Sequence, residues 1–165
     1  GMIWIAEMLK QMEKLTTART QSAAETEACG AELAKQMLDD AGIPPFIALY
    51  GDLGVGKTAF VRGFASVIAP GITVRSPTFA LVNEYKAKPR PLFHFDMYRI
   101  SNEDDLLSIG FYDYLDRPGI CLVEWSENIP YALPDDYVRV ELRKDDADKP
   151  DSRTLTIEQI GGSAS

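Results

Sequence analysis

The chain has 165 residues, 45% of them hydrophobic, which is enough for one domain with a core and too little for two. Its net charge is −8, from 17 Lys and Arg against 25 Asp and Glu, which argues against a large non-specific footprint on a nucleic-acid backbone. The two cysteines form no CxxC pair, and no run approaches the roughly 20 apolar residues of a membrane span. We therefore expect a cytoplasmic protein with reduced cysteines and no membrane contact, in which any nucleic-acid role runs through a partner.

The two ends of the chain are expected to lie outside the folded domain. Gly1 before Met2 is typical of a residue added for expression, and residues 2–14 form a short, weakly amphipathic lead segment that we expect to be poorly ordered. Residues 161–165 are predicted to be a loose tail. The predicted single domain therefore spans residues 15–160.

The first half of the domain is predicted to run strand, helix, strand. Leu15–Thr20 is β-prone, and Ser22–Glu25 has the form of a capping box, in which the Ser and Glu side chains satisfy free N–H groups at a helix start. Gly42–Pro45 ends the helix before the apolar run Phe46–Tyr50. One stripe of the predicted helix consists of Ala24, Ala28, Ala31, Ala34 and Leu38.

A complete phosphate-binding motif, GxxxxGK[ST], follows the Phe46–Tyr50 run directly at Gly51–Thr58. Its glycines let backbone N–H groups approach phosphate oxygens without a Cβ in the way. Lys57 can reach the β- and γ-phosphates, and the Thr58 hydroxyl can bind Mg²⁺. The next residues, Ala59–Ile68, have apolar side chains at helical spacing, so the motif stands between a strand and a helix whose positive end faces the anion. The sequence therefore predicts binding of a nucleoside triphosphate.

The second half of the chain predicts short strands and one helical patch. Ser101 and Asp104 suggest a second capping box, and Gly110 is expected to end or bend that helix. Val138–Leu142 and Arg153–Ile157 have the pattern of strands with alternating buried and exposed faces. We expect them to pair as an antiparallel hairpin around the charged turn Lys144–Asp151. The short strand-like runs are Thr73–Val74, Phe79–Val82, Leu92–Phe95 and Ile120–Val123. Together these patterns predict an α/β, three-layer P-loop fold with a mixed, mainly parallel sheet and late antiparallel strands.

Two acids follow buried-strand patterns and are candidates for the magnesium side of the site. Asp96 follows Leu92–Phe95, and Glu124 follows Ile120–Val123. Both would emerge at the carboxyl edge of the sheet, where oxygen ligands suit Mg²⁺. Because the second run is the more apolar, Glu124 is favoured as the metal-side acid. Asp96 would then hold a metal-bound water or position the attacking water.

Other polar residues allow weaker predictions. Ser76-Pro77-Thr78 is either a hydroxyl segment that senses the γ-phosphate or an ordinary proline turn. The one histidine, His94, is interpreted as a core residue rather than a catalytic one. Arg75, Arg99 and Arg153 are each possible ligands of a phosphate or of the transition state, and their spacing in the sequence does not indicate which of them has this role. No NKxD-type guanine-reading segment follows Glu124, which favours ATP over GTP.

Four ordered motifs together resemble the bacterial TsaE (YjeE) family, the ATPases of tRNA threonylcarbamoyladenosine biosynthesis. The motifs are the loop, Ser76-Pro77-Thr78-Phe79, His94–Arg99 and Leu122-Val123-Glu124-Trp125. The resemblance runs from about Thr16 to Ile157. It implies Mg²⁺-dependent ATP hydrolysis, slow in isolation, and association with the TsaB and TsaD proteins, through which tRNA would be reached. The lead segment is longer than the family pattern requires.

The resemblance also implies roles for particular residues. Lys57, Asp96 and Glu124 would be catalytic, with Thr58, Glu124 and Asp96 around the metal. Trp125 would support the site or the partner surface. The predicted ATP-binding residues are Gly51, Asp52, Leu53, Gly54, Val55, Gly56, Lys57, Thr58 and Ala59, with Thr78 facing the nucleotide, Thr26 near the adenine and Arg153 as a weaker contact.

Two other readings of the loop stay open at this stage. A small-molecule kinase would share it, but it needs a substrate pocket and usually a basic lid, for which Lys86–Arg90 is too short. A nucleotide-dependent adaptor would bind ATP without hydrolysis. Release of phosphate with and without candidate acceptors separates these readings.

Overall fold

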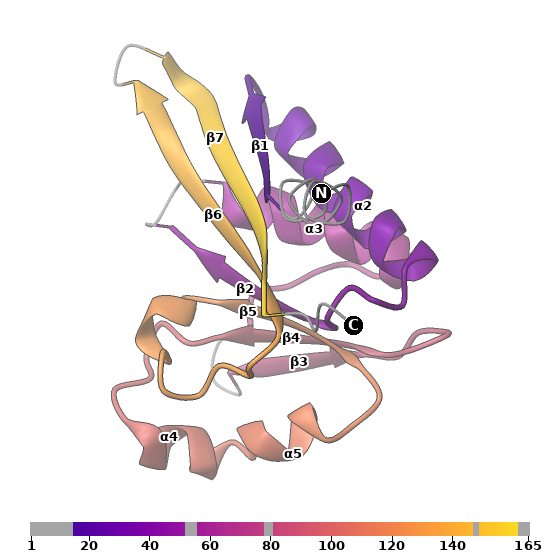
Figure 1. Cartoon of the computed structure of the whole chain (residues 1–165), viewed down its shortest axis with the longest axis vertical. Coiled ribbons are helices and arrows are strands. Elements are labelled where there is room, and N and C mark those ends of the chain that lie inside the picture. Colours follow the sequence, from indigo (N-terminus) through magenta and orange to yellow (C-terminus); the bar gives the residue numbers. More distant parts are fainter. Residues whose placement is uncertain (1–14, 52–55, 78–80, 147–148, 162–165) are drawn as a thin grey trace, which may run out of the picture.

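The computed structural model describes residues 15–51, 56–77, 81–146 and 149–161, which contain both helices and strands. The predicted lead segment and nearly all of the predicted tail lie outside these residues. The elements are β1 (Leu15–Thr20), α2 (Ala23–Asp39), β2 (Phe46–Tyr50), α3 (Lys57–Ile68), β3 (Val82–Tyr85), β4 (Leu92–Asp96), α4 (Glu103–Ser108), α5 (Phe111–Leu115), β5 (Ile120–Glu124), the short 3₁₀ helix η1 (Ser126–Asn128), β6 (Tyr137–Asp146) and β7 (Lys149–Ile160) (Figure 1).

The described strands form one seven-stranded sheet in the order β1-β7-β6-β2-β5-β4-β3. Its centre is parallel, because β2 pairs in parallel with both β6 and β5, and β4 pairs in parallel with β5. Its edges are antiparallel, through β3 on one side and the β6–β7–β1 ribbon on the other. The predicted α/β fold with a mixed sheet and a late hairpin is confirmed, with the parallel pairing concentrated in the middle.

Each face of the sheet carries its own apolar core, which gives the fold three layers. Helices α2 and α3 cover one face, and α4 and α5 cover the other (Figure 1). Because side chains alternate along a strand, Leu92 and Leu122 pack with α2 and α3, whereas Phe93, Phe95 and Val123 pack with α4 and α5. The even-numbered positions of β4 and β5 therefore face the helix that follows the phosphate loop.

Two glycines bring α2 and α3 close together. A Cβ at Gly30 would overlap the Phe60 carbonyl oxygen, and one at Gly63 would overlap the Glu27 carbonyl oxygen. This contact sets which face of α2 is buried, and of the stripe noted in the sequence only Ala34 is buried. The face that is buried consists of Thr26, Gly30, Leu33, Ala34 and Met37.

The capping box predicted at Ser22 is confirmed, since Ser22 Oγ accepts the Glu25 N–H at 3.1 Å and Glu25 Oε2 accepts the Gln21 N–H at 3.1 Å. Helix α4, predicted from a capping box at Ser101, begins one residue later than predicted. Asn102 is its N-cap and accepts the Asp105 N–H at 3.1 Å. A predicted short strand at Thr73–Val74 is absent from the described residues. Gly110 separates α4 from α5 with φ +70°.

Candidate nucleotide-binding site

The two described ends of the phosphate loop both use backbone that favours glycine. Gly51 follows β2 with φ +140°, and Gly56 stands directly before α3 with φ +100°. A left-handed conformation of this kind is strained for any residue with a Cβ. The predicted ligands Asp52, Leu53, Gly54 and Val55 lie outside the described residues. The two glycines therefore fix how the chain leaves the sheet and enters the helix.

Lys57, the first residue of α3, is only 5% exposed. Its Nζ donates a hydrogen bond to the Gly51 carbonyl oxygen at 2.5 Å and lies 3.9 Å from the centre of the Trp125 ring. Both contacts are favourable for an ammonium group removed from water. The Lys57 ammonium group is thus held between the Trp125 ring and the carbonyl of Gly51, the residue at which the loop begins.

Asp96 and Glu124 lie side by side at the ends of β4 and β5, opposite each other in the parallel register. Burial raises the pKa of Asp96. The Tyr98 N–H donates to Asp96 Oδ1 at 3.0 Å and acts to lower this pKa. The nearby Glu124 charge raises the pKa further, whereas His94 and Lys57 lower it. Glu124 Oε2 lies 2.7 Å from His94 Nε2. The two acids and Lys57 are therefore close enough to interact electrostatically.

The backbone is strained beside both acids. Leu81 and Trp125 are the two non-glycine residues in the described ranges with positive φ, at 62° and 58°. The Leu81 carbonyl oxygen accepts the Asp96 N–H at 3.1 Å, and Trp125 directly follows Glu124. Such conformations cost roughly 1–3 kcal/mol each and cluster at functional sites. Here the turn at Trp125 carries its ring over Lys57.

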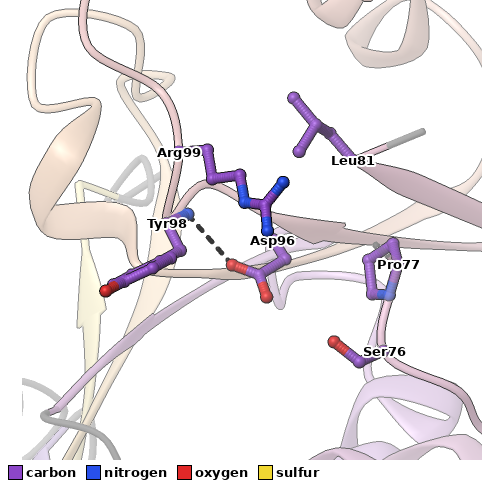
Figure 2. A pocket seen from close by; sticks show the side chains of 6 residues that line it. All are labelled: Ser76, Pro77, Leu81, Asp96, Tyr98 and Arg99. Carbon is purple, nitrogen blue, oxygen red and sulfur yellow. Dashed lines mark hydrogen bonds between the residues drawn. The ribbon is translucent and has the colours of Figure 1, made fainter. Parts of the chain in front are cut away.

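A cavity of about 180 Å³ is lined in part by Asp96. In Figure 2 the Asp96 carboxylate and the Ser76 side chain border it, with Arg99 and Tyr98 beside them. Ser76 and Pro77 therefore lie next to a site acid, as the γ-phosphate-sensing interpretation of that segment requires. Thr78 lies outside the described residues.

The other predicted ligands lie in different surroundings. Thr58 is exposed, whereas Ala59 is buried. Thr26 is buried beneath Gly56, and its hydroxyl is hydrogen-bonded to that of Thr20 at 2.7 Å. Arg153, on β7, donates to the carbonyl oxygens of Pro150 and Ser152 on its own strand. The structure thus brings Lys57, Asp96 and Glu124 together.

Two residues join the site that the sequence analysis did not place there. Glu127 Oε2 accepts the Gly51 N–H at 3.3 Å, which ties η1 to the loop. His94 contacts Glu124. A period of two could have found His94, because His94 and Asp96 share one face of β4. Nothing in the local sequence indicates Glu127, since its contact depends on the turn at Trp125.

The oxygen ligands near the loop suit a nucleotide with bound Mg²⁺. An exposed threonine hydroxyl and carboxylates at strand ends are the hard oxygen ligands that Mg²⁺ prefers, and Mg²⁺ usually takes only one or two of them besides phosphate oxygens and waters. Residues 15–51, 56–77, 81–146 and 149–161 contain no cluster of three or more His, Cys, Asp or Glu that could hold a metal ion. Over the same residues, none of the helices has the length and apolar character needed to cross a membrane.

A central parallel strand, a glycine-bounded loop and a buried lysine at the first turn of the next helix define a P-loop nucleotide-binding protein. The sequence profile of one such family, described as "Threonylcarbamoyl adenosine biosynthesis protein TsaE", matches residues 20–155. The chain belongs to the TsaE family. The resemblance expected from the four motifs is therefore confirmed.

Individual relatives agree with the family profile. The "tRNA threonylcarbamoyladenosine biosynthesis protein TsaE" of Bacillus subtilis (strain 168) is 36% identical over 115 residues, which are 70% of this chain and 70% of the relative. The protein of the same name from Haemophilus influenzae is 40% identical over 96 residues, 58% of this chain and 61% of the relative. The crystal structure of Bacillus subtilis YdiB has a TM-score of 0.65 at 33% identity and covers 90% of this chain and 87% of its own.

Proposed function

We propose that this chain is a Mg²⁺-dependent ATPase that acts in the cytoplasm with the TsaB–TsaD complex to form threonylcarbamoyladenosine in tRNA. The family and the names of its relatives support the process. The observation that carries the ATPase assignment is the buried Lys57 at the loop, on the same face of the sheet as two adjacent strand-end acids.

The contacts of Lys57 suggest how it would bind phosphate. Its ammonium group already lies in a largely dry position on the Gly51 carbonyl and the Trp125 ring, so little desolvation remains to be done when an anion arrives. A phosphate oxygen offers a stronger, charge-assisted partner than a carbonyl. Lys57 would therefore turn from the Gly51 carbonyl toward the β- and γ-phosphates while Trp125 keeps water from the lysine.

The two acids would divide the remaining work. Glu124 and the exposed Thr58 hydroxyl would hold Mg²⁺, which when bound offsets the charge on the phosphates. Asp96 faces the cavity shared with Ser76, and burial raises the pKa of its carboxyl. A carboxylate with a raised pKa is a stronger base. Asp96 would accordingly orient the attacking water and accept a hydrogen bond from it.

Hydrolysis by the chain alone is expected to be slow, with the partner complex ordering or completing the site. The acidic balance of −8 fits a subunit that contributes nucleotide chemistry while the complex holds the tRNA. Turnover that is fast in isolation and unchanged by TsaB and TsaD would contradict this part of the proposal.

Phosphate release from ATP, measured with and without TsaB–TsaD, tests the proposed ATPase. Glu124→Ala is expected to retain nucleotide binding and lose Mg²⁺-dependent hydrolysis, with a smaller loss in Asp96→Ala. Asp39→Ala, an exposed acid at the end of α2, is the matched control and should hydrolyse normally. A larger loss at Asp96 would reverse the two roles. Release that requires a metabolite acceptor would indicate a kinase, and ATP binding without release would indicate an adaptor.

A further inference from the structure

His94, the single histidine of the chain, is buried in the sheet behind the site. It is 2% exposed, and its Nε2 lies 2.7 Å from Glu124 Oε2, whose side chain is 12% exposed. His94 Nδ1 is the one buried side-chain nitrogen or oxygen, among residues whose placement is described, that has no hydrogen-bond partner. The two ring nitrogens are therefore in opposite situations.

This asymmetry indicates where the imidazole carries its proton. A buried N–H without an acceptor loses its hydrogen bond to water and gains none in return, so a proton on Nδ1 would be unfavourable. A proton on Nε2 can be donated to the Glu124 carboxylate at hydrogen-bond distance. The ring is thus expected to carry its proton on Nε2, with a bare, buried Nδ1.

A donor in this position restricts Glu124. A glutamate has three side-chain torsions and two equivalent oxygens, and Glu124 is the last residue of β5. The bond to His94 engages Oε2 and restricts how the carboxylate can turn, which favours presentation of Oε1 to the site. His94 itself is fixed because it lies on β4, opposite Leu122 on one side and Asn83 on the other.

We propose that His94 is a positioning residue, which donates its Nε2–H to Glu124 Oε2 and thereby sets the oxygen that Glu124 presents to the nucleotide-bound metal. This inference rests on the proposed function, in which Glu124 is the metal-side acid. Partners of this kind, which orient a metal ligand, typically contribute 10- to 100-fold in metal affinity or activity.

Nitrogen-15 NMR of the full chain without a histidine tag tests the hydrogen bond independently of any activity. A single histidine gives one pair of imidazole resonances. We expect a protonated Nε2 and a bare Nδ1, with the Nε2 resonance shifting in Glu124→Gln. Protonation at Nδ1, or an Nε2 resonance that Glu124→Gln leaves unchanged, would overturn the proposal.

ATP hydrolysis with TsaB–TsaD tests the positioning role. His94→Leu removes the donor, and His94→Asn places its amide near the Nδ1 position, too short to reach Glu124. Both are expected to lower kcat roughly 10- to 100-fold with little change in the KM for ATP. His94→Gln places an N–H near the Nε2 position and should recover most of the rate.

The pattern across these variants separates positioning from packing. Equal losses in the Gln and Asn variants, or a raised KM with kcat unchanged, would show that His94 serves only the core and would overturn the inference. If His94→Leu does not fold, the comparison of Gln with Asn decides. Absence of hydrolysis by the unsubstituted chain would overturn the proposed function instead, whereas the NMR result would still stand on its own.

Discussion

The two faces of β4 and β5 come from the same ten residues but do different work. On the face toward α4 and α5, Phe93, Phe95, Cys121 and Val123 pack into a core rich in edge-to-face aromatic pairs. On the face toward α2 and α3, the same strands end in Asp96 and Glu124, with the buried His94 beside them. Alternation along a strand separates the two roles by one residue. Both faces therefore stabilise the sheet, and the face toward α2 and α3 also carries the candidate site.

The largest effect on stability is expected on the aromatic face. Phe111 is fully buried and makes edge-to-face contacts with Phe46 and Phe95. Phe111→Ala should reduce the free energy of unfolding by about 3–5 kcal/mol, measured by urea denaturation. Leu107→Ala, in the neighbouring α4 but 58% exposed, is the control, with an expected change within about 0.5 kcal/mol. A loss in Phe111→Ala as small as that in Leu107→Ala would mean that Phe111 is not part of a packed core.

Next in size is the close approach of α2 and α3 on the other face. A methyl group at Gly63 would overlap the Glu27 carbonyl oxygen, and neither backbone can yield locally. Gly63→Ala should therefore reduce the free energy of unfolding by about 3 kcal/mol, and nucleotide affinity should fall with it, because α3 carries Lys57. In Gly42→Ala the added group meets only the Asp40 side chain. A Gly63→Ala protein as stable as this control would rule out the close helix contact.

The next effect concerns Lys57, on the face of the sheet toward α2 and α3, and its contribution to ATP binding. Lys57→Ala should weaken ATP binding roughly 10- to 100-fold, since a charge-assisted hydrogen bond contributes about 1.5–3 kcal/mol. Equilibrium binding of a fluorescent ATP analogue measures the change. Lys35→Ala, at an exposed position of α2, should bind as the unsubstituted chain does. Unchanged affinity in Lys57→Ala would show that the lysine does not contact phosphate.

The smallest effect concerns a surface ion pair at the edge of the aromatic core. Arg117 donates to both Glu84 oxygens, at 2.8 and 2.9 Å, and its hydrogen bonds lower the pKa of Glu84 from 4.5. A lowered pKa means that the pair stabilises the fold above about pH 4.5 and that this gain is lost as pH falls below it. Glu84→Gln should be slightly less stable than the unsubstituted chain at pH 7, with the difference vanishing in acid and in high salt. A difference that does not shrink as the pH is lowered below 4.5 would contradict the ion-pair explanation.

Much of the fold could be predicted because its signals are local. The Ser22 capping box set the start of α2, and apolar runs marked β2, β4 and β5. The buried face of α2 could not be predicted in the same way. An alanine stripe looks apolar in sequence, but the side that is buried is chosen by a contact between two backbones, at Gly30 and Gly63. That contact depends on the other helix.

In the candidate site, too, the features with local sequence signals could be predicted, and those that depend on contacts between distant segments could not. The loop and the two acids were predicted from spacing, because parallel strands end at one edge of the sheet. The pairing of His94 with Glu124 was missed, since it requires the register of β4 against β5. The placement of Trp125 over Lys57 depends on a positive φ, which local propensity disfavours for such a bulky residue.

Formation of threonylcarbamoyladenosine from purified components tests the proposed function most directly. Product per TsaB–TsaD complex would be followed over many turnovers, with the chain, without it, and with Lys57→Ala. We predict repeated turnover only with the unsubstituted chain, and no more than one round with Lys57→Ala or without the chain. Sustained turnover in the absence of this chain, or undiminished turnover with Lys57→Ala, would contradict the assignment of an ATPase that drives tRNA modification.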